Sequence, residues 1–187
     1  MKRLFDFIAS LIALVIFLVP MLIIGFAIKF NSTGPILFKQ KRIGLNGSYF
    51  YIYKFRTMKI DTPNVSTEAL GDPSAYITSV GKFLRKTSLD ELPQLLNILK
   101  GDMSVVGPRP ALYNQYELIA LRDKVGVNSI RPGLTGYAQI MGRDFITDEK
   151  KVKYDYHYLE NMSLLLDVKI IWRTVFSVAK AEGVRLK

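Results

Sequence analysis

The chain has 187 residues, 49% of them hydrophobic, and its 26 Lys and Arg outnumber 16 Asp and Glu to give a formal net charge of +10. This length is sufficient for one domain with a hydrophobic core. With no cysteine and a single histidine, the chain has no disulfide scaffold, no thiol nucleophile and little scope for a His-based metal site. The positive charge indicates an anionic partner, such as phosphate, nucleic acid or an anionic membrane surface.

Residues 7–28 form an uncharged, mostly apolar run that is long enough to cross a bilayer core of about 30 Å. A cleaved signal peptide is disfavoured because the run is long and no cleavage site follows it. Pro20 lies near the middle and predicts a kink. Basic residues flank both ends, which suits a hairpin entering and leaving by one face, whereas a true span usually shows a one-sided bias. Physical reasoning leaves these two topologies open.

The remainder of the chain predicts a β-hairpin followed by helices. Residues 36–43 and 48–57 have strand composition and are joined by a turn at 44–47. Residues 61–75 are predicted to form a loop. Helices are predicted from about Val80 and over 112–124, 148–160 and 163–181. The last is either a core helix or an interfacial helix with Trp172 and a basic rim.

The stretch 84–110 is where chemistry is expected. Leucines at positions 92, 95, 96 and 99 have helical spacing, and Lys100-Gly101 is a stop signal. Proline is tolerated only in the first turn, so Pro93 predicts that the helix begins close to Asp90. Asp90 and Glu91 are then at the positive end of the helix dipole, which also favours a bound phosphate. Because acidic residues are ordinary caps there, the pair alone leaves capping and catalysis open.

Three arginines are mounted beside rigid turns. Arg109 lies between two prolines, Arg131 precedes Pro-Gly, and Arg143 follows a glycine. The planar guanidinium matches phosphate oxygens with two parallel hydrogen bonds. Phosphoryl transfer needs carboxylates that bind Mg²⁺ or attack phosphorus, and arginines that stabilise charge on the phosphoryl oxygens. The chain has no GxxxxGK[ST], GxGxxG or Asp-x-Asp motif, so phosphate is handled by another route.

Seven segments match one family in order: Lys2-Arg3 with Asp6, 53–58 (YKFRTM), 88–95 (SLDELPQL), 100–104 (KGDMS), 107–110 (GPRP), 131–136 (RPGLTG) and 166–169 (LDVK). On these segments and the proline-broken membrane helix, the chain resembles the small monotopic phosphoglycosyl transferases. These are bacterial sugar transferases that begin the assembly of capsule and other glycans. The stretches 59–65 and 109–118 look most like the capsule-type members.

The resemblance implies an α+β fold: a mostly helical monotopic membrane protein with an N-terminal re-entrant helix, amphipathic interfacial helices and a small β-hairpin. It implies a membrane element over 1–30 and a catalytic domain over 31–187, at the cytoplasmic face of the bacterial inner membrane. There is one departure, since the family often has Ser before the membrane proline and this chain has Val19.

The resemblance also implies a two-step mechanism. Asp90 attacks the sugar phosphate of a UDP-sugar and releases UMP, and undecaprenyl phosphate then takes the phospho-sugar from Asp90. Glu91 is implied to assist in Mg²⁺ binding or acid–base work, and the main-chain carbonyl of Arg85 is implied as a further metal ligand. Substrate-binding roles are implied for Arg109, Arg143, Arg131, Lys54 and Arg56.

Two other functions remain as alternatives. One is a glycosyltransferase that releases UDP, which the missing Asp-x-Asp argues against. The other is a membrane-anchored scaffold without catalysis. A nucleic-acid partner is not expected because the basic residues are dispersed. The sequence does not identify the sugar, for which the capsule-type resemblance suggests an N-acetylated deoxysugar. It also leaves the oligomeric state open, with a homodimer as one option.

Overall fold

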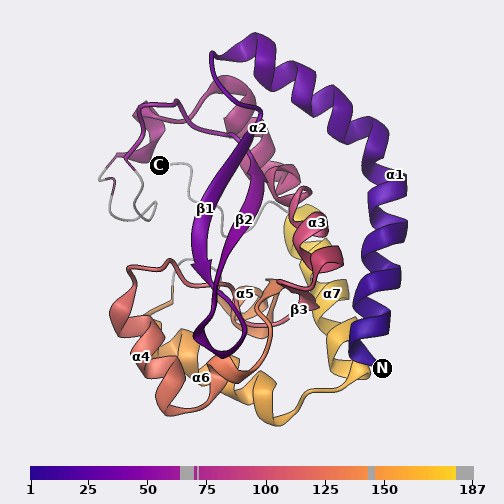
Figure 1. Cartoon of the computed structure of the whole chain (residues 1–187), viewed down its shortest axis with the longest axis vertical. Coiled ribbons are helices and arrows are strands. Elements are labelled where there is room, and N and C mark those ends of the chain that lie inside the picture. Colours follow the sequence, from indigo (N-terminus) through magenta and orange to yellow (C-terminus); the bar gives the residue numbers. More distant parts are fainter. Residues whose placement is uncertain (64–69, 71, 143–145, 180–187) are drawn as a thin grey trace.

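A computed structural model describes residues 1–63, 70, 72–142 and 146–179 (Figure 1). The fold is α+β and mostly helical, as expected. The helices are α1 (Lys2–Asn31), α2 (Ser79–Thr87), α3 (Gln94–Lys100), α4 (Tyr116–Lys124), α5 (Tyr137–Gly142), α6 (Asp148–Glu160) and α7 (Leu164–Ala179). The strands are β1 (Leu37–Ile43), β2 (Tyr49–Phe55), β3 (Ser104–Val106) and β4 (Gly133–Thr135). Short 3₁₀ turns are η1 (Leu45–Gly47), η3 (Pro73–Ala75), η4 (Leu89–Glu91) and η5 (Val127–Ser129).

Helix α1 lies on the outside of the molecule and is bent. Figure 1 shows it running along one side and then turning across the end near α2. Pro20 lies inside the helix, where it removes a backbone hydrogen bond and favours a bend. Among the described helices, α1 is the one whose length and composition allow it to cross a membrane. Only 11% of its most apolar window is buried, whereas the core helix of a soluble protein is mostly buried.

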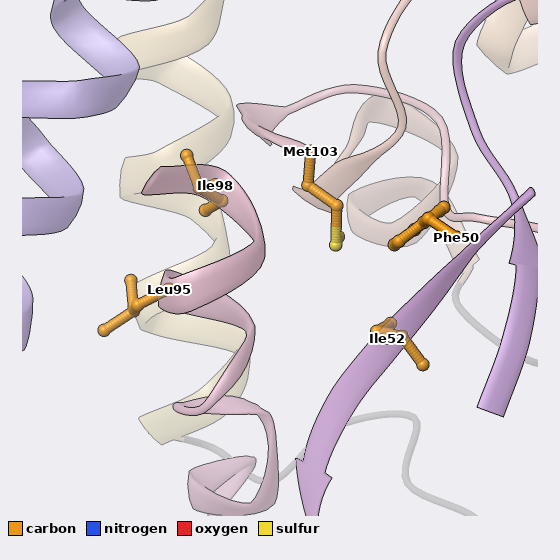
Figure 2. Packing of buried hydrophobic residues seen from close by; sticks show 5 residues of the cluster. All are labelled: Phe50, Ile52, Leu95, Ile98 and Met103. Carbon is orange, nitrogen blue, oxygen red and sulfur yellow. The ribbon is translucent and has the colours of Figure 1, made fainter. Parts of the chain in front are cut away.

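Helix α3 is packed between α1 and the β1–β2 hairpin. One core cluster joins Phe50 and Ile52 of β2 to Leu95 and Ile98 of α3, with Met103 following α3 (Figure 2). Partly buried side chains of α1 complete the cluster from the other side. Each buried side chain of this size contributes roughly 1.5–3 kcal/mol of hydrophobic stabilisation. The packing therefore holds α3 against both the hairpin and the candidate membrane helix.

A buried amide extends the hairpin toward α3. The side-chain oxygen of Asn97 accepts a hydrogen bond from the backbone N–H of Tyr53 at 3.0 Å. Its side-chain nitrogen donates to the Tyr51 carbonyl at 2.8 Å and to the Asp102 carboxylate at 3.1 Å. Asn97 thus satisfies the edge of β2 as a neighbouring strand would. These hydrogen bonds fix the position of α3 along the length of β2.

A small parallel pair, β3 with β4, brings two sequence motifs together. Its register pairs Ser104 with Gly133 and Val106 with Thr135. The Gly133 N–H also donates to the Pro108 carbonyl at 2.8 Å, so the 107–110 turn lies against 131–136. A Cβ at Gly133 would overlap the backbone nitrogen of Gly107. The close approach of the two turns therefore requires glycine.

The N-terminal end of α1 is anchored in the domain by charged side chains. Asp6 is buried and accepts hydrogen bonds from the Ser104 hydroxyl at 2.8 Å and the Val105 N–H at 3.0 Å. Lys2 donates to the Asp167 carboxylate of α7 at 2.7 Å. Arg3 donates to the carbonyls of Ile98 at 2.6 Å and Leu99 at 3.0 Å. Arg3 thus adds hydrogen bonds to two carbonyls at the C-terminal end of α3, and the one of Ile98 also accepts from the Gly101 N–H.

Helix α7 serves both roles left open by the sequence. Asp167 and Ile170 are buried against the domain. An apolar stripe on its other face is exposed: Leu165, Val168, Trp172, Val175 and Phe176. The spacing of this stripe is that of one helix face. An exposed apolar stripe with Trp is typical of an interfacial helix.

Two predicted boundaries were wrong. The helix expected over 112–124 begins at Tyr116, because the Leu112 N–H is taken by the Gln115 side chain at 2.8 Å and Leu112 pairs with Arg42 as an isolated β-bridge. The helix expected to begin at Asp90 starts as the 3₁₀ turn η4, and α3 proper begins at Gln94. The N–H groups near Pro93 bond three residues back, so the first turn is tighter than an α-turn.

Candidate active site

The Asp90–Glu91 pair is presented by a sharp reversal between α2 and α3. Ser88 closes α2 in the left-handed conformation, with φ of 56°. Its N–H donates to the Arg85 carbonyl at 3.3 Å, and η4 begins at the next residue. A non-glycine residue with positive φ is uncommon and here redirects the chain within one residue. The reversal places both carboxylates on the turn that leads into α3.

The Glu91 carboxylate is held between two cations. One of its oxygens, Oε1, accepts from Lys54 Nζ at 2.5 Å and from Arg109 Nη2 at 2.9 Å. Burial alone would raise the pKa of Glu91, but the charges and hydrogen bonds of Arg109 and Lys54 outweigh it and hold that pKa well below its usual range. Burial lowers the pKa of Lys54, and Glu91 offsets this in part. Glu91 is therefore fixed in place as a carboxylate.

Asp90 has a different environment from its neighbour. Burial raises the pKa of Asp90 to about 6, with the repulsion of Glu91 adding to it and the charges of Lys54, Arg85 and Arg109 opposing it. Within the described part of the chain, no hydrogen bond is made to the Asp90 carboxylate. The Asp90 carboxyl remains mostly ionised at neutral pH. When the environment gives two adjacent carboxylates different pKa values, the two groups typically have different roles in catalysis.

Arg109 is held at the site through its main chain. The Arg122 guanidinium donates to the Arg109 carbonyl at 2.8 Å. Arg122 is itself paired with Asp155 of α6 through two bonds, of 3.0 Å from Nε and 2.7 Å from Nη2. Both partners are almost fully buried. The pair fixes the backbone of the Gly-Pro-Arg-Pro turn, so the Arg109 side chain leaves it in a set direction.

The structure brings together some of the expected site residues and separates others. Asp90, Glu91, Lys54 and Arg109 converge, and the Arg85 side chain is close enough to influence Asp90. Arg143 lies outside the described residues.

Two expected substrate-binding arginines lie away from this cluster. The Arg56 guanidinium is buried at the C-terminal end of α1, where it donates to the carbonyls of Thr33 and Ser32, at 2.8 Å for Ser32. Arg131 donates from Nε to the Gly101 carbonyl at 2.9 Å, after α3. Their guanidinium groups satisfy main-chain carbonyls, so neither residue enters the mechanism proposed below.

Three residues near the site were missed by sequence reasoning: Arg42, Arg122 and Asp155. Arg42 lies on β1, and alternation along the strand gives it the same face as Gln40. The alternation can be read from the sequence, but local sequence patterns do not show that this face of β1 is directed toward Glu91. Arg122 and Asp155 lie on separate helices, and their pairing depends on how α4 packs against α6.

The residues at this turn fit a magnesium ion. Among the described residues there is no group of three or more His, Cys, Asp or Glu that could enclose a metal. Magnesium, however, is commonly bound by one or two carboxylates together with waters and substrate phosphates. The Asp90 carboxylate accepts no hydrogen bond from the described residues, and the Arg85 carbonyl accepts one from the Ser88 N–H. Both are hard oxygen donors of the kind that Mg²⁺ prefers.

A family model described as "Bacterial sugar transferase" matches residues 1–181. The chain belongs to the bacterial sugar transferase family. It is 42% identical to the uncharacterized sugar transferase EpsL of Bacillus subtilis, over 99% of this chain and 90% of EpsL. It is 40% identical to the exopolysaccharide production protein ExoY of Rhizobium meliloti, over 97% of this chain and 87% of ExoY. It is 41% identical to a UDP-glucose:undecaprenyl-phosphate glucose-1-phosphate transferase of Caulobacter vibrioides, over 97% of this chain and 71% of that protein.

The family match runs through every element that builds the site, from α1 to α7. This transferase is therefore an enzyme, and the scaffold alternative is set aside. Its long apolar helix and its relatives together indicate membrane association.

Proposed function

We propose that this protein transfers a sugar-1-phosphate from a UDP-sugar to undecaprenyl phosphate through a covalent intermediate on Asp90, with release of UMP. The general reaction is supported by the similarity to the UDP-glucose:undecaprenyl-phosphate glucose-1-phosphate transferase of Caulobacter vibrioides. The observation that carries the finer proposal is the contrast between Asp90, ionised and without a hydrogen bond from the described residues, and Glu91, held by two cations. A nucleophile needs a free lone pair.

In the first step, an Asp90 carboxylate oxygen forms a bond to the sugar-bearing phosphorus. The bond from that phosphorus to the bridging oxygen breaks, and this oxygen leaves as part of the phosphate of UMP. Arg109, whose Nη2 bonds Glu91, carries the planar guanidinium that binds phosphoryl oxygens with two parallel hydrogen bonds. Fixed positive charge at the site stabilises the transition state without reorganisation.

In the second step, an oxygen of undecaprenyl phosphate attacks the same phosphorus. The bond to the Asp90 oxygen breaks and the carboxylate is regenerated, so the protein returns to its starting state. The product is an undecaprenyl diphospho-sugar. Glu91 keeps Lys54 and Arg109 in place through both steps, since its carboxylate binds both cations.

A magnesium ion bound through Asp90, Glu91 and the Arg85 carbonyl would supply positive charge beside the phosphates. Glu91 could contribute its second carboxylate oxygen, because the two cation bonds are both made to Oε1. In this scheme the side chains of Lys54 and Arg109 hold the Glu91 carboxylate in place through its other oxygen.

The membrane arrangement that fits this reaction is re-entrant. The bent α1 would enter and leave the bilayer by the cytoplasmic face of the inner membrane, and the exposed stripe of α7 would lie at the interface. A polyprenyl phosphate has its head group at that interface and its tail in the bilayer. An enzyme embedded in one leaflet can thus bring η4 to the head group. The homodimer suggested by the family stays a prediction.

The identity of the released nucleotide tests this function. Purified protein in detergent is supplied with Mg²⁺, undecaprenyl phosphate and a panel of UDP-sugars, and the nucleotide product is separated by chromatography. UMP from the wild type and none from Asp90→Asn are expected, and the active donor identifies the sugar. Release of UDP would show a glycosyltransferase and contradict the proposal.

A further inference from the structure

We propose that Arg42 is a second phosphate-binding residue, which takes the diphosphate of the nucleotide sugar together with Arg109. The inference deepens the proposed function and rests on the site described for it. Sequence reasoning had treated Arg42 only as one of the basic residues that follow the membrane helix. The structure places it beside the Gly-Pro-Arg-Pro turn instead.

Backbone pairing puts Arg42 next to Arg109. The Ile43 N–H donates to the Ala111 carbonyl at 3.0 Å, and Arg42 pairs with Leu112 as an antiparallel bridge. The strand β1 therefore runs alongside the residues that directly follow Arg109. The Arg42 side chain donates from Nη1 to the Pro110 carbonyl at 2.8 Å. Its guanidinium is thus attached to the turn that presents Arg109.

Arg42 makes no direct ion pair with a described residue, although the charge of the Glu91 carboxylate acts on it. Its Nη2 donates to Gln40 Oε1 at 2.6 Å, so both hydrogen-bond acceptors, this oxygen and the Pro110 carbonyl, are neutral. Its Nε is buried without a hydrogen bond from the described residues. A guanidinium has five N–H donors, and two of these are used. Desolvation of a cation is unfavourable unless negative charge compensates it, and an anionic ligand would add to the compensation from Glu91.

The charge at the site supports an anionic ligand. Four cations act on one another and on the acidic pair: Arg42, Lys54, Arg85 and Arg109. Among the described residues, these cations face two carboxylates, Asp90 and Glu91. Burial and the repulsion of Arg109 lower the pKa of Arg42 to about 9. A diphosphate, with a negative charge on each phosphate, would relieve this repulsion.

The competing explanation is that Arg42 has a purely structural role, in which its bond to the Pro110 carbonyl stabilises the turn. If Arg42 only stabilised the turn at Pro110, its replacement would disturb folding and the whole site, including the part that recognises the nucleoside. Loss of a phosphate-binding residue would weaken the binding of ligands that carry phosphate, such as UDP, and would leave the binding of the nucleoside uridine unchanged. Binding of UDP compared with uridine separates the two roles without turnover.

The test measures the dissociation constants of UDP and uridine by calorimetry for the full chain in detergent. The variants are Arg42→Gln, Arg42→Lys and the matched control Lys41→Gln. Lys41 is the next residue on β1, and its ammonium lies on the opposite face, 3.9 Å from the Tyr49 ring centroid. Lys41→Gln therefore removes the same charge from the same strand but not from the site.

Loss of a charge-assisted hydrogen bond is expected to weaken UDP binding by about tenfold to a hundredfold in Arg42→Gln. Uridine binding and the melting temperature should be unchanged, Arg42→Lys should lie between, and Lys41→Gln should match the wild type. The proposal is overturned if Arg42→Gln binds UDP like the wild type, if UDP and uridine weaken together, or if the wild type binds UDP no better than uridine. Nucleotide release by the wild type is scored separately. UDP release there would refute the transfer mechanism while the binding result stands.

Discussion

Asp6 of α1 and Ser104 of β3 are 98 residues apart and are joined by a buried hydrogen bond of 2.8 Å. The next residue, Val105, donates its N–H to the same carboxylate. Strand β3 leads directly into the turn that presents Arg109. The candidate membrane helix α1 is thus attached to the segment that positions Arg109, a proposed phosphate-binding residue.

Asp6→Ala is expected to lower the free energy of unfolding by roughly 2–4 kcal/mol, because it leaves a buried backbone N–H and a buried hydroxyl without their acceptor. Unfolding by urea in detergent, followed by circular dichroism, measures this. The matched control is Asp61→Ala, which removes an exposed carboxylate and should change stability by less than about 0.5 kcal/mol. Equal effects of the two changes would contradict a structural role for Asp6.

The buried pair Arg122–Asp155 gives a second prediction, about stability. Removing one partner leaves an uncompensated buried charge, so Arg122→Met or Asp155→Leu alone should cost roughly 3–5 kcal/mol. The double variant should be much more stable than the sum of the two losses predicts, since neither charge remains. A double-mutant cycle measured by urea unfolding tests this, and additive losses would rule out direct coupling.

Activity of the same double variant tests whether the pair positions Arg109. The variant no longer bonds the Arg109 carbonyl, so kcat/KM for the UDP-sugar should fall even where stability is recovered. Partial rescue is expected from Arg122→Lys with Asp155 retained, because the ammonium can still reach a carbonyl. If a stable double variant had the kcat/KM of the wild type, the turn would position Arg109 without help from Arg122 and Asp155.

Local patterns predicted much of this fold from the sequence. The β1–β2 hairpin, α6, α7 and the long α1 with Pro20 all follow from composition, alternation and turn residues. The start of α3 was misplaced because local rules locate proline in a first turn but do not distinguish a 3₁₀ turn from an α-turn. The start of α4 was misplaced because Leu112 pairs with β1, which is a tertiary contact.

The candidate site was predicted in its acidic half and less well in its basic half. Asp90 and Glu91 are adjacent in sequence, so one motif reveals both. The cations come from β1, β2, α2 and the turn after β3, and whether an arginine faces a carboxylate or a free carbonyl depends on packing. Arg56 illustrates this: its motif resembled a binding segment, and its guanidinium satisfies the end of α1.

The natural absence of cysteine makes the re-entrant topology directly testable. Leu4 and Phe30 lie near the two ends of α1 and are 65% and 87% exposed, so a cysteine at either position should be reachable when it lies outside the bilayer. In vesicles of known orientation, Leu4→Cys and Phe30→Cys should react with a membrane-impermeant maleimide from the same, cytoplasmic side. Val15→Cys is the matched control within the apolar run and should be protected. Labelling of the two ends from opposite sides would show a span.

The pH dependence of the first step should reflect Asp90. Its pKa is raised to about 6, and the attacking form is the carboxylate, so the rate should be present above this pH and should be lost as pH falls through about 6. Glu91 cannot cause this loss, because its pKa is lowered. The measurement is kcat/KM against pH at several Mg²⁺ concentrations. A metal on Asp90 should shift the midpoint to lower pH as Mg²⁺ rises, and a midpoint independent of Mg²⁺ would exclude Asp90 as a ligand.

The raised pKa of Asp90 also predicts the stability of the variant used to test its role. When the pKa of a carboxyl is higher in the folded than in the unfolded state, the free energy of unfolding falls as pH rises from the unfolded pKa to the folded pKa. Asp90→Asn should therefore be at least as stable as the wild type at pH 7, which thermal unfolding measures. Loss of activity in a stable variant can then be assigned to chemistry.

The most direct test of the central claim is to look for the phospho-sugar on Asp90. Protein is incubated with the active UDP-sugar, labelled in the phosphate next to the sugar, without acceptor lipid, and is then digested and analysed by mass spectrometry. The account predicts a label on the peptide that contains Asp90, its absence in Asp90→Asn, and its loss on addition of undecaprenyl phosphate. A wild type that turns over in the full assay but never carries label, or carries it on another residue, would contradict Asp90 as the nucleophile.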